Sequence, residues 1–272
     1  MQKLNMRQIR AFQTNILDYY HKNKRDFPWR TAITPYKIVV SEIMLQQTQA
    51  PRAVEKFKSF IKQFPNFSAL HHAEFKDVLI AWQGLGYNRR AKYLKQIAQM
   101  VTTQYKGRLP QNPEVLKTLP GIGSHTAGSI CAFAFNLPIP FIETNIRSVF
   151  IHEFFKDKND IHDKDIWPLV EHTLYIKNPR EWYNALMDYG AMLKEKSKNP
   201  SRKSVHYIKQ SAFKGSDREL RGRILKVLTT DDLKLGELIS KLEEDERRVE
   251  KNVDDLMFEK MIKKIDGTVS IY

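Results

Sequence analysis

The stretch LPGIGSHTAG, residues 119–128, decides the fold of this chain. It is typical of a helix, a tight glycine turn and a second helix. Pro120 and Gly121 end the first helix, and Gly123 permits backbone conformations that a side chain would exclude. The second helix then begins with backbone N–H groups that point outward and can bind a phosphate. In a chain with a net charge of +14, this turn indicates binding to a nucleic acid.

The length and composition of the chain indicate an ordered globular protein. Its 272 residues allow one large domain or two smaller ones, and 42% of them are hydrophobic. The longest apolar run, residues 130–142, contains prolines and does not match a membrane span. The N-terminus is polar and basic, without an apolar signal region. The single cysteine, Cys131, excludes an intramolecular disulfide, so we expect a cytoplasmic, nucleoid-associated protein without a membrane partner.

Positive charge is concentrated in the first part of the chain. Residues 217–272 contain 12 basic and 14 acidic residues, whereas residues 1–216 contain 33 basic and 17 acidic ones. We therefore expect the polyanion-binding surface on residues 1–216. A basic surface that only aids solubility is the alternative.

Helical periodicity dominates residues 1–210 and predicts an all-α domain of about ten helices. Two of these helices, residues 113–119 and 126–135, flank the glycine turn. Beyond a linker at residues 199–215, apolar spacing predicts three short helices, and Asp266-Gly267 forms a turn between two β-prone segments. Residues 217–272 therefore resemble a small winged-helix-like domain. The alternative is a helical extension that packs on the main domain.

Two acidic residues have surroundings that suit catalysis. Glu42 lies near the start of a predicted helix among apolar neighbours, where desolvation keeps a carboxyl group protonated as a general acid. Glu143 follows an apolar run and precedes a helix for which Thr144 or Asn145 is the expected cap. A carboxylate there suits the stabilisation of an oxocarbenium-like sugar. For both acids, the alternative is a residue that only stabilises a helix start.

Polar and aromatic side chains in the same segments suit contacts with DNA. The amides of Gln46 and Gln47 suit base edges or a wedge into a base stack. Tyr87 follows a Gly-Leu-Gly turn and suits a groove contact, and Arg89 and Arg90 suit phosphates. The alternative for this turn is a plain corner between two helices.

Six short segments occur in an order that matches one family. They are PWR at 28–30, PYK at 35–37, SEIMLQQT at 41–48, GLGY at 84–87, LPGIG at 119–123 and MDYGA at 187–191. The chain thereby resembles the helix-hairpin-helix superfamily of DNA glycosylases, and within it the mismatch-specific adenine DNA glycosylases. The resemblance covers about residues 8–192, and SEIMLQQT is a highly specific segment.

The resemblance implies a two-lobed all-α glycosylase domain at residues 1–210, with the DNA and the active site between the lobes. Residues 26–136 would form a six-helix lobe, and residues 1–25 with 137–210 would form the second lobe. The domain would remove a flipped base by hydrolysis of its N-glycosidic bond. The winged-helix-like domain would follow at residues 217–272.

The resemblance also assigns roles to single residues. Glu42 matches the acid that protonates the departing adenine, and Gln47 matches a wedge opposite the extruded base. Tyr87 matches a minor-groove contact, Arg30 lies near the purine pocket, and Asn145 matches an active-site asparagine. The two glycines of the turn match a main-chain phosphate anchor.

The chain departs from the family pattern at catalytic positions. Glu143 replaces an aspartate that stabilises the sugar cation, so the carboxylate moves by about one methylene. His125 stands where bifunctional lyases carry a nucleophilic lysine, which argues against strand cleavage. His125 either places an imidazole beside bound DNA or only packs and caps.

The family's iron–sulfur cluster and its C-terminal sensor of oxidised guanine are not recognisable. The four cysteine ligands would fall at about Lys194, Ser201, Ser204 and Gln210. None of these residues is cysteine, so no cluster forms through thiolates.

The predicted site has three parts. Catalytic roles are expected for Glu42, Glu143, Asn145 and His125, and the base pocket is expected at Arg30 and Asp188. DNA contacts are expected for Gln46, Gln47, Tyr87, Arg89, Arg90, Gly121, Gly123, Ser124 and Thr126. We expect no metal site and no iron–sulfur cluster, while the hairpin suits a monovalent cation.

Together with the resemblance, these residues favour a monomeric, monofunctional DNA glycosylase of base excision repair that acts on mismatched adenine in double-stranded DNA. Two alternatives stay open. One is a glycosylase for thymine or uracil opposite guanine, or for a modified base. The other is a catalytically inactive protein that binds lesions or DNA. The winged-helix-like region offers a surface for a protein partner.

Overall fold

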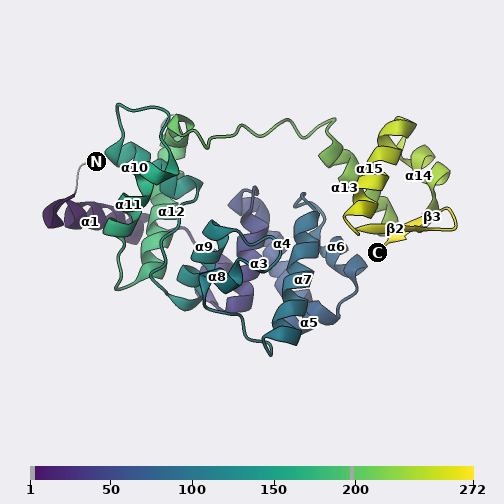
Figure 1. The fold of residues 1–272 in the computed structure, drawn as a ribbon, viewed down its shortest axis with the longest axis horizontal. Helices are drawn as coiled ribbons and strands as arrows, with labels where there is room; N and C mark the ends of the chain where they lie inside the picture. The colour runs from purple at the N-terminus through teal and green to yellow at the C-terminus, as the bar shows by residue number, and fades with distance from the viewer. Residues whose placement is uncertain (1–3, 197–198) are drawn as a thin grey trace. The chain divides into compact units, whose positions relative to one another are not determined.

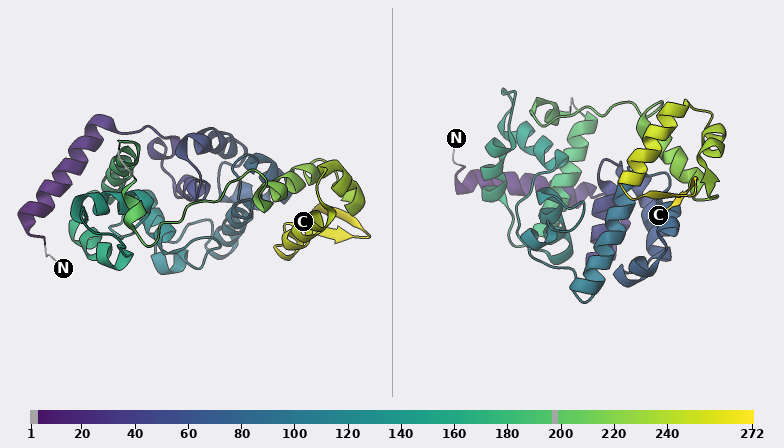
Figure 2. Two further views of the ribbon diagram at one scale, coloured as in Figure 1. Left: turned by 90° about the horizontal axis from the view of Figure 1, so that it is seen from above. Right: turned by 45° about the vertical axis from the view of Figure 1, so that its right-hand side comes forward.

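The computed structural model describes residues 4–196 and 199–272, which are mostly helical (Figures 1 and 2). The predicted all-α class is confirmed, with one small sheet near the C-terminus. The described residues form two compact units. The first unit contains residues 4–38, 110–118, 122–196 and 199–209, and the second contains residues 39–109, 119–121 and 210–272. The domain and lobe boundaries expected from the sequence stay predictions.

Aromatic side chains hold the first unit together. Helices α1 (Met6–Asn23) and α10 (Thr144–Phe154) both pack against α12 (Pro179–Lys196). Phe12 of α1 meets Phe150 and Trp182 edge-on, with ring centroids 5.5 and 5.7 Å apart. The unit also contains α2 (Pro28–Thr31), α8 (Pro113–Leu116), α9 (Ser124–Phe135), α11 (Asp163–Thr173) and the 3-10 helix η1 (Pro200–Lys203). Helix α3 (Pro35–Leu45) begins in this unit and ends in the second.

Helix α7 (Arg89–Gln104) organises the first part of the second unit. Helices α5 (Phe67–His72) and α6 (Phe75–Trp82) pack against it, and α4 (Ala50–Gln63) packs against α6. The apolar spacing that predicts α7 places Leu94 and Ile97 in the core, where both are fully buried.

The C-terminal part of the second unit, drawn in light green to yellow in Figure 1, combines three helices with a three-stranded sheet. Strand β3 pairs antiparallel with both β1 and β2. This order of elements agrees with the winged-helix-like arrangement predicted from the sequence. In chain order the elements are α13 (Asp217–Leu228), β1 (Leu233–Lys234), α14 (Leu235–Leu242), α15 (Glu246–Phe258), β2 (Ile262–Ile265) and β3 (Thr268–Ile271).

Polar contacts join this C-terminal part to α6 and α7. Glu259 is the acceptor for Arg221 at 2.5 Å and for Arg89 at the start of α7. The Gln83 amide donates to the Thr229 hydroxyl at 2.9 Å. The charges of the two arginines hold the pKa of the Glu259 carboxyl below its usual range, although burial alone would raise it.

The glycine turn forms between α8 and α9, as the sequence predicts. Helix α8 ends at Leu116, earlier than expected, because Thr118 donates its N–H to Val115 and closes a turn. Gly121 has a φ of +74°, and a Cβ on it would lie 2.5 Å from the ring of Tyr93. This position therefore requires glycine for both its backbone and its packing.

A buried arginine supports the loops of the second unit from within. Arg90 lies in the first turn of α7 and is 6% exposed. Its guanidinium donates at 2.6 to 3.2 Å to the carbonyls of Ile43, Met44, Gln46, Leu85 and Gly86 and to the hydroxyl of Thr48. These bonds join the C-terminal end of α3 to the turn at residues 84–87. Burial lowers the pKa of Arg90 to about 10, so the group is charged at neutral pH.

Replacing Arg90 tests how much its hydrogen bonds contribute to the stability of the protein. We expect Arg90→Met to lower the free energy of unfolding by roughly 2–4 kcal/mol, because buried carbonyls lose their donors. Urea denaturation measures the change. The matched control is Arg108→Met, which removes an exposed arginine from the same unit and should stay within about 0.5 kcal/mol of wild type. Equal unfolding midpoints for the two variants would contradict this role.

Candidate active site

Glu143 lies at the N-terminal end of α10 and caps the helix with its own side chain. Its Oε1 accepts the backbone N–H groups of Asn145 at 2.5 Å and Ile146 at 2.9 Å. The expected cap at Thr144 or Asn145 is therefore wrong, because the longer glutamate arm folds back onto the first turn. Backbone N–H groups and the positive end of the helix favour a negative charge at this position.

Two further side chains extend this arrangement within the first unit. The Asn145 amide donates to Glu143 Oε2 at 3.3 Å, and its Oδ1 accepts the ammonium of Lys194 at 2.8 Å. The lysine thus fixes which end of the amide faces the carboxylate. Gly190 makes room for this geometry, since a Cβ on it would overlap the backbone of Asn145.

Lys194 is a residue that sequence reasoning missed. It entered the sequence analysis only as the position of a missing cysteine. Desolvation lowers the pKa of its ammonium, and Arg147 and Arg25 lower it further, while the Glu143 carboxylate raises it. The available signal was spacing: Lys194 lies four residues after Gly190 and therefore on the same face of α12.

The predicted base-pocket residues form a buried ion cluster in the first unit. Asp188 is 2% exposed and receives two hydrogen bonds from the Arg30 guanidinium, at 2.8 and 2.9 Å. The Arg25 side chain donates to the same carboxylate at 2.7 Å. Burial alone would raise the pKa of Asp188, but the two arginines hold it below its usual range. These hydrogen bonds hold the Arg30 side chain on Asp188. A place for Arg30 near a base pocket stays a prediction.

The second unit contains Glu42 and the predicted wedge residues. Glu42 is half-buried in α3, next to the fully buried Ile43 and the nearly fully buried Ser41. Ile43 is apolar whereas Ser41 is polar, so the apolar surroundings expected for the Glu42 carboxyl stay a prediction. Gln46 donates its amide to the carbonyl of Gly121 at 3.1 Å, which ties the end of α3 to the glycine turn.

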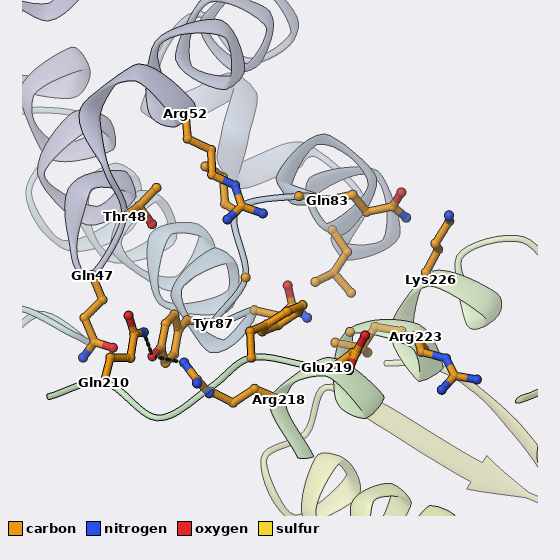
Figure 3. Close-up of a pocket in the computed structure, with 18 of the residues that line it drawn as sticks. Gln47, Thr48, Arg52, Gln83, Tyr87, Gln210, Arg218, Glu219, Arg223 and Lys226 are labelled. Atoms are coloured by element: carbon orange, nitrogen blue, oxygen red, sulfur yellow. Dashed lines mark hydrogen bonds between the residues drawn. The ribbon is translucent and has the colours of Figure 1, made fainter. Parts of the chain in front are cut away.

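Two predicted DNA-contact residues have strained backbones. Gln47 and Tyr87 have φ values of 55° and 47°, in the left-handed region that side chains disfavour. The Tyr87 hydroxyl accepts hydrogen bonds from Arg218 and Gln210, which converge on it in Figure 3.

The N-terminus of α9 carries the predicted phosphate anchor. Its N-cap is Gly123, and no side chain caps the first turn. Ser124 and His125 are exposed, whereas Thr126 is buried. The surrounding protein nevertheless lowers the pKa of the His125 imidazole through desolvation, an effect that Glu143 opposes and Arg147 reinforces.

The two predicted phosphate-binding arginines of α7 lie in different surroundings. Arg89 is exposed and pairs with Glu259. Arg90 is buried, and its donors are directed at protein carbonyls. Its structural role is to hold the loops that carry Gln47 and Tyr87.

The residues at the expected cluster positions do not fit an iron–sulfur cluster, which requires thiolates. Ser201 and Ser204 are buried, and the Ser201 hydroxyl donates to Asn199 at 2.7 Å. In the described parts of the chain, no three His, Cys, Asp or Glu side chains gather where a metal ion could bind. The same residues contain no helix with the length and apolar character needed to cross a membrane.

Comparisons with known proteins identify the family and the fold. Residues 40–265 match the family described as HhH-GPD superfamily base excision DNA repair protein. The chain is 37% identical over 188 residues to an adenine DNA glycosylase of Buchnera aphidicola, which covers 67% of this chain and 53% of that protein. It is 33% identical over 245 residues to an adenine DNA glycosylase of Mycobacterium tuberculosis, which covers 79% of this chain and 77% of the relative. The chain thus spans about half the length of the Buchnera relative.

Solved structures share the fold. A thermostable thymine-DNA glycosylase superposes with a TM-score of 0.63 at 28% identity, covering 72% of this chain and 91% of that one. A non-covalent endonuclease III–DNA complex superposes with a TM-score of 0.54 at 17% identity, covering 70% of this chain and 86% of that one. The second likeness concerns the fold alone.

The environment of Lys194 is directly measurable. We expect an NMR titration of its ε-methylene group to give a pKa below 10.5, because burial disfavours the ammonium form. Glu143→Gln should lower this pKa further, since the carboxylate that favours the charged form is lost. The control Glu195→Gln removes an exposed acid from the same helix and should leave it unchanged. A pKa of 10.5 or higher, or one insensitive to Glu143→Gln, contradicts the described contact.

Proposed function

Since the chain belongs to the HhH-GPD superfamily of base excision DNA repair proteins, we propose that it is a DNA glycosylase that releases mismatched adenine. The adenine DNA glycosylases among its relatives support this choice of base. The observation that carries the proposal is the carboxylate of Glu143, which is held by its own helix and oriented beside Asn145. A fixed negative charge of this kind suits a developing sugar cation.

The reaction is a hydrolysis of the bond between the sugar and the base. Glu42 donates its proton to a ring nitrogen of adenine, and the electrons of the glycosidic bond leave with the base. Glu42 is half-buried in α3, and a carboxyl group that carries its proton can serve as a general acid. The sugar becomes a cation at C1′, and Glu143 stabilises it. Water then adds to C1′, and its proton passes to the Glu42 carboxylate, which restores the acid.

Asn145 and Lys194 act in this proposal as positioning residues. Glutamate has one methylene more than the aspartate of the family pattern. Two backbone N–H groups donate to Glu143 Oε1 and thereby hold the carboxylate in one position. Lys194 directs the Asn145 amide nitrogen toward Oε2. The site thus tolerates glutamate through local hydrogen bonds.

The remaining expectations belong to the same proposal. The protein binds mismatched double-stranded DNA as a cytoplasmic, nucleoid-associated monomer and works without an iron–sulfur cluster. Gly121, Gly123, Ser124 and Thr126 anchor the strand, and the hairpin accepts a monovalent cation. His125 replaces the lysine of strand-cleaving relatives, so the enzyme is monofunctional.

Thymine opposite guanine is a second candidate substrate. It is favoured by the 28% identity to the thymine-DNA glycosylase and by His125 in the hairpin. A catalytically inactive DNA-binding protein is disfavoured by the presence of both acids.

A panel of duplexes identifies the excised base. The duplexes carry adenine, thymine or uracil opposite guanine, and adenine opposite oxidised guanine. We expect release of free adenine, with strand breaks only after alkali. Glu42→Gln and Glu143→Gln should each slow the single-turnover rate by about 100-fold or more, because the first removes the proton donor and the second removes the charge that stabilises the sugar cation. The exposed acid Glu195 supplies the control variant Glu195→Gln, which should react normally.

Three results would contradict the proposal. Normal excision by Glu42→Gln would exclude the general acid. Release of thymine in place of adenine would exclude adenine as the substrate and support thymine opposite guanine. Strand breaks without alkali would exclude a monofunctional enzyme.

A further inference from the structure

The Glu143 carboxylate has two cationic neighbours in the first unit, yet it forms an ion pair with neither in the described part of the chain. Its oxygens accept uncharged donors instead, which belong to the first turn of α10. One neighbour, Lys194, donates to the amide oxygen of Asn145. The other neighbour, Arg147, is bound to Asp163. The negative charge of Glu143 is therefore not paired.

Arg147 starts from a place close to this carboxylate. It lies on α10 four residues after Glu143, and its backbone N–H donates to the Glu143 carbonyl at 2.8 Å. Side chains four residues apart lie on the same face of a helix. Desolvation lowers the pKa values of His125 and Lys194, and the charge of Arg147 lowers both further. Arg147 is thus near enough to act on the groups around Glu143.

Asp163, the first residue of α11, holds the Arg147 side chain by two hydrogen bonds. The guanidinium donates from Nε to Oδ1 and from Nη2 to Oδ2, at 2.7 Å each. This two-pronged geometry is the one in which arginine binds a carboxylate most strongly. Burial alone would raise the pKa of Asp163, but the hydrogen bonds and charge of Arg147 hold it below its usual value. Asp163 is therefore charged at neutral pH and keeps its hold on Arg147.

An ion pair between Arg147 and Glu143 would oppose the proposed reaction. Negative charge that is fixed and uncompensated stabilises a developing sugar cation. A guanidinium bonded to Glu143 would offset that charge and would itself repel the cation. The Arg147 side chain is only 14% exposed, so water does little to screen such an effect.

We propose that Asp163 is a positioning residue for the reaction, which binds Arg147 and thereby keeps this cation off the Glu143 carboxylate. The inference rests on the proposed function, because it concerns the charge that Glu143 offers to the sugar. Asn145 does the same for the second cation, since its amide oxygen accepts the ammonium of Lys194. Both cations are then held beside the carboxylate without neutralising it.

The alternative is that the ion pair only fastens α10 to α11. Asp163 lies in the first turn of α11, where the helix dipole favours an acid in any case. In that role, loss of the pair would lower the free energy of unfolding and leave the chemical step of the folded protein unchanged. Rates of the folded variants therefore distinguish the two roles.

Asp163→Asn tests the proposal, because asparagine keeps the size of the side chain and loses its charge. The single-turnover rate is measured on the duplex from which wild-type protein releases a base, at a temperature where every variant is folded. We expect a rate about 10-fold lower, without weaker binding of the duplex, since the released guanidinium offsets part of the Glu143 charge. The control Asp165→Asn removes an acid from the same turn, which accepts the N–H of His162, and should react at the wild-type rate.

Removing the released cation should reverse the defect. Asp163→Asn combined with Arg147→Met should react within about 3-fold of the wild-type rate, because no guanidinium remains to pair with Glu143. Arg147→Met alone should also stay within that range. A double variant as slow as Asp163→Asn would show that the loss does not come from Arg147, and would overturn the inference.

The Glu143→Gln background separates positioning from general damage to the site. Adding Asp163→Asn to Glu143→Gln should change the rate by less than about 2-fold, because no carboxylate is left to protect. A structural disturbance would act through other groups as well and would slow this variant further. A further 10-fold loss in this background therefore also overturns the inference.

Failure of this inference and failure of the proposed function give different results. If wild-type protein releases a base and Asp163→Asn does so at the same rate, Asp163 has no part in positioning and the proposed function stands. If wild-type protein releases no base from any duplex, the proposed function fails and the inference fails with it.

Discussion

The buried guanidinium of Arg90 is the interaction on which the second unit depends. Carbonyl groups at the C-terminal end of a helix have no partner within the helix, and the negative end of its dipole favours a cation. Arg90 satisfies the carbonyls of Ile43 and Met44 at that end of α3 and, with the same group, the carbonyls of Leu85 and Gly86. A planar group with five donors can hold two loops at once, which lysine cannot. The segments that carry Glu42, Gln47 and Tyr87 are therefore held by a buried residue whose donors are directed at protein oxygens.

In the first unit, a side chain satisfies unpaired backbone groups at the N-terminal end of helix α10. There the unpaired groups are N–H donors, and Glu143 satisfies them with a carboxylate that also serves the proposed chemistry. Lys194 lies on α12 at about the position where the family pattern has a cysteine ligand of the iron–sulfur cluster. From α12 its long cationic side chain reaches Asn145. The proposed catalytic role and the structural role thus fall on the same few polar groups.

The sequence predicted the features that depend on local pattern. Helical spacing placed the core of α7, and glycine with its neighbours placed the turn at residues 119–123. The helices and hairpin of residues 217–272 also followed from spacing and from Asp266-Gly267. The short motifs identified the family, which residues 40–265 match.

Features that depend on long-range contacts were not predictable in this way. Arg90 looked like a surface cation because its neighbours in sequence are basic and polar, whereas two of its partners, Ile43 and Met44, lie more than forty positions earlier, in α3. The contact of Lys194 with Asn145 joins α12 to α10 and has no signal in either segment alone. The cap of α10 was misplaced because a glutamate arm is long enough to fold back, which spacing does not reveal.

The central claim is that Glu42 and Glu143 hydrolyse an N-glycosidic bond. A single-turnover reaction in ¹⁸O-labelled water, followed by mass spectrometry of both products, tests it most directly. The account predicts unlabelled free adenine and one ¹⁸O atom on the abasic sugar, with neither product formed by Glu42→Gln on the same time scale. An intact duplex, or a product without ¹⁸O at the sugar, would contradict it.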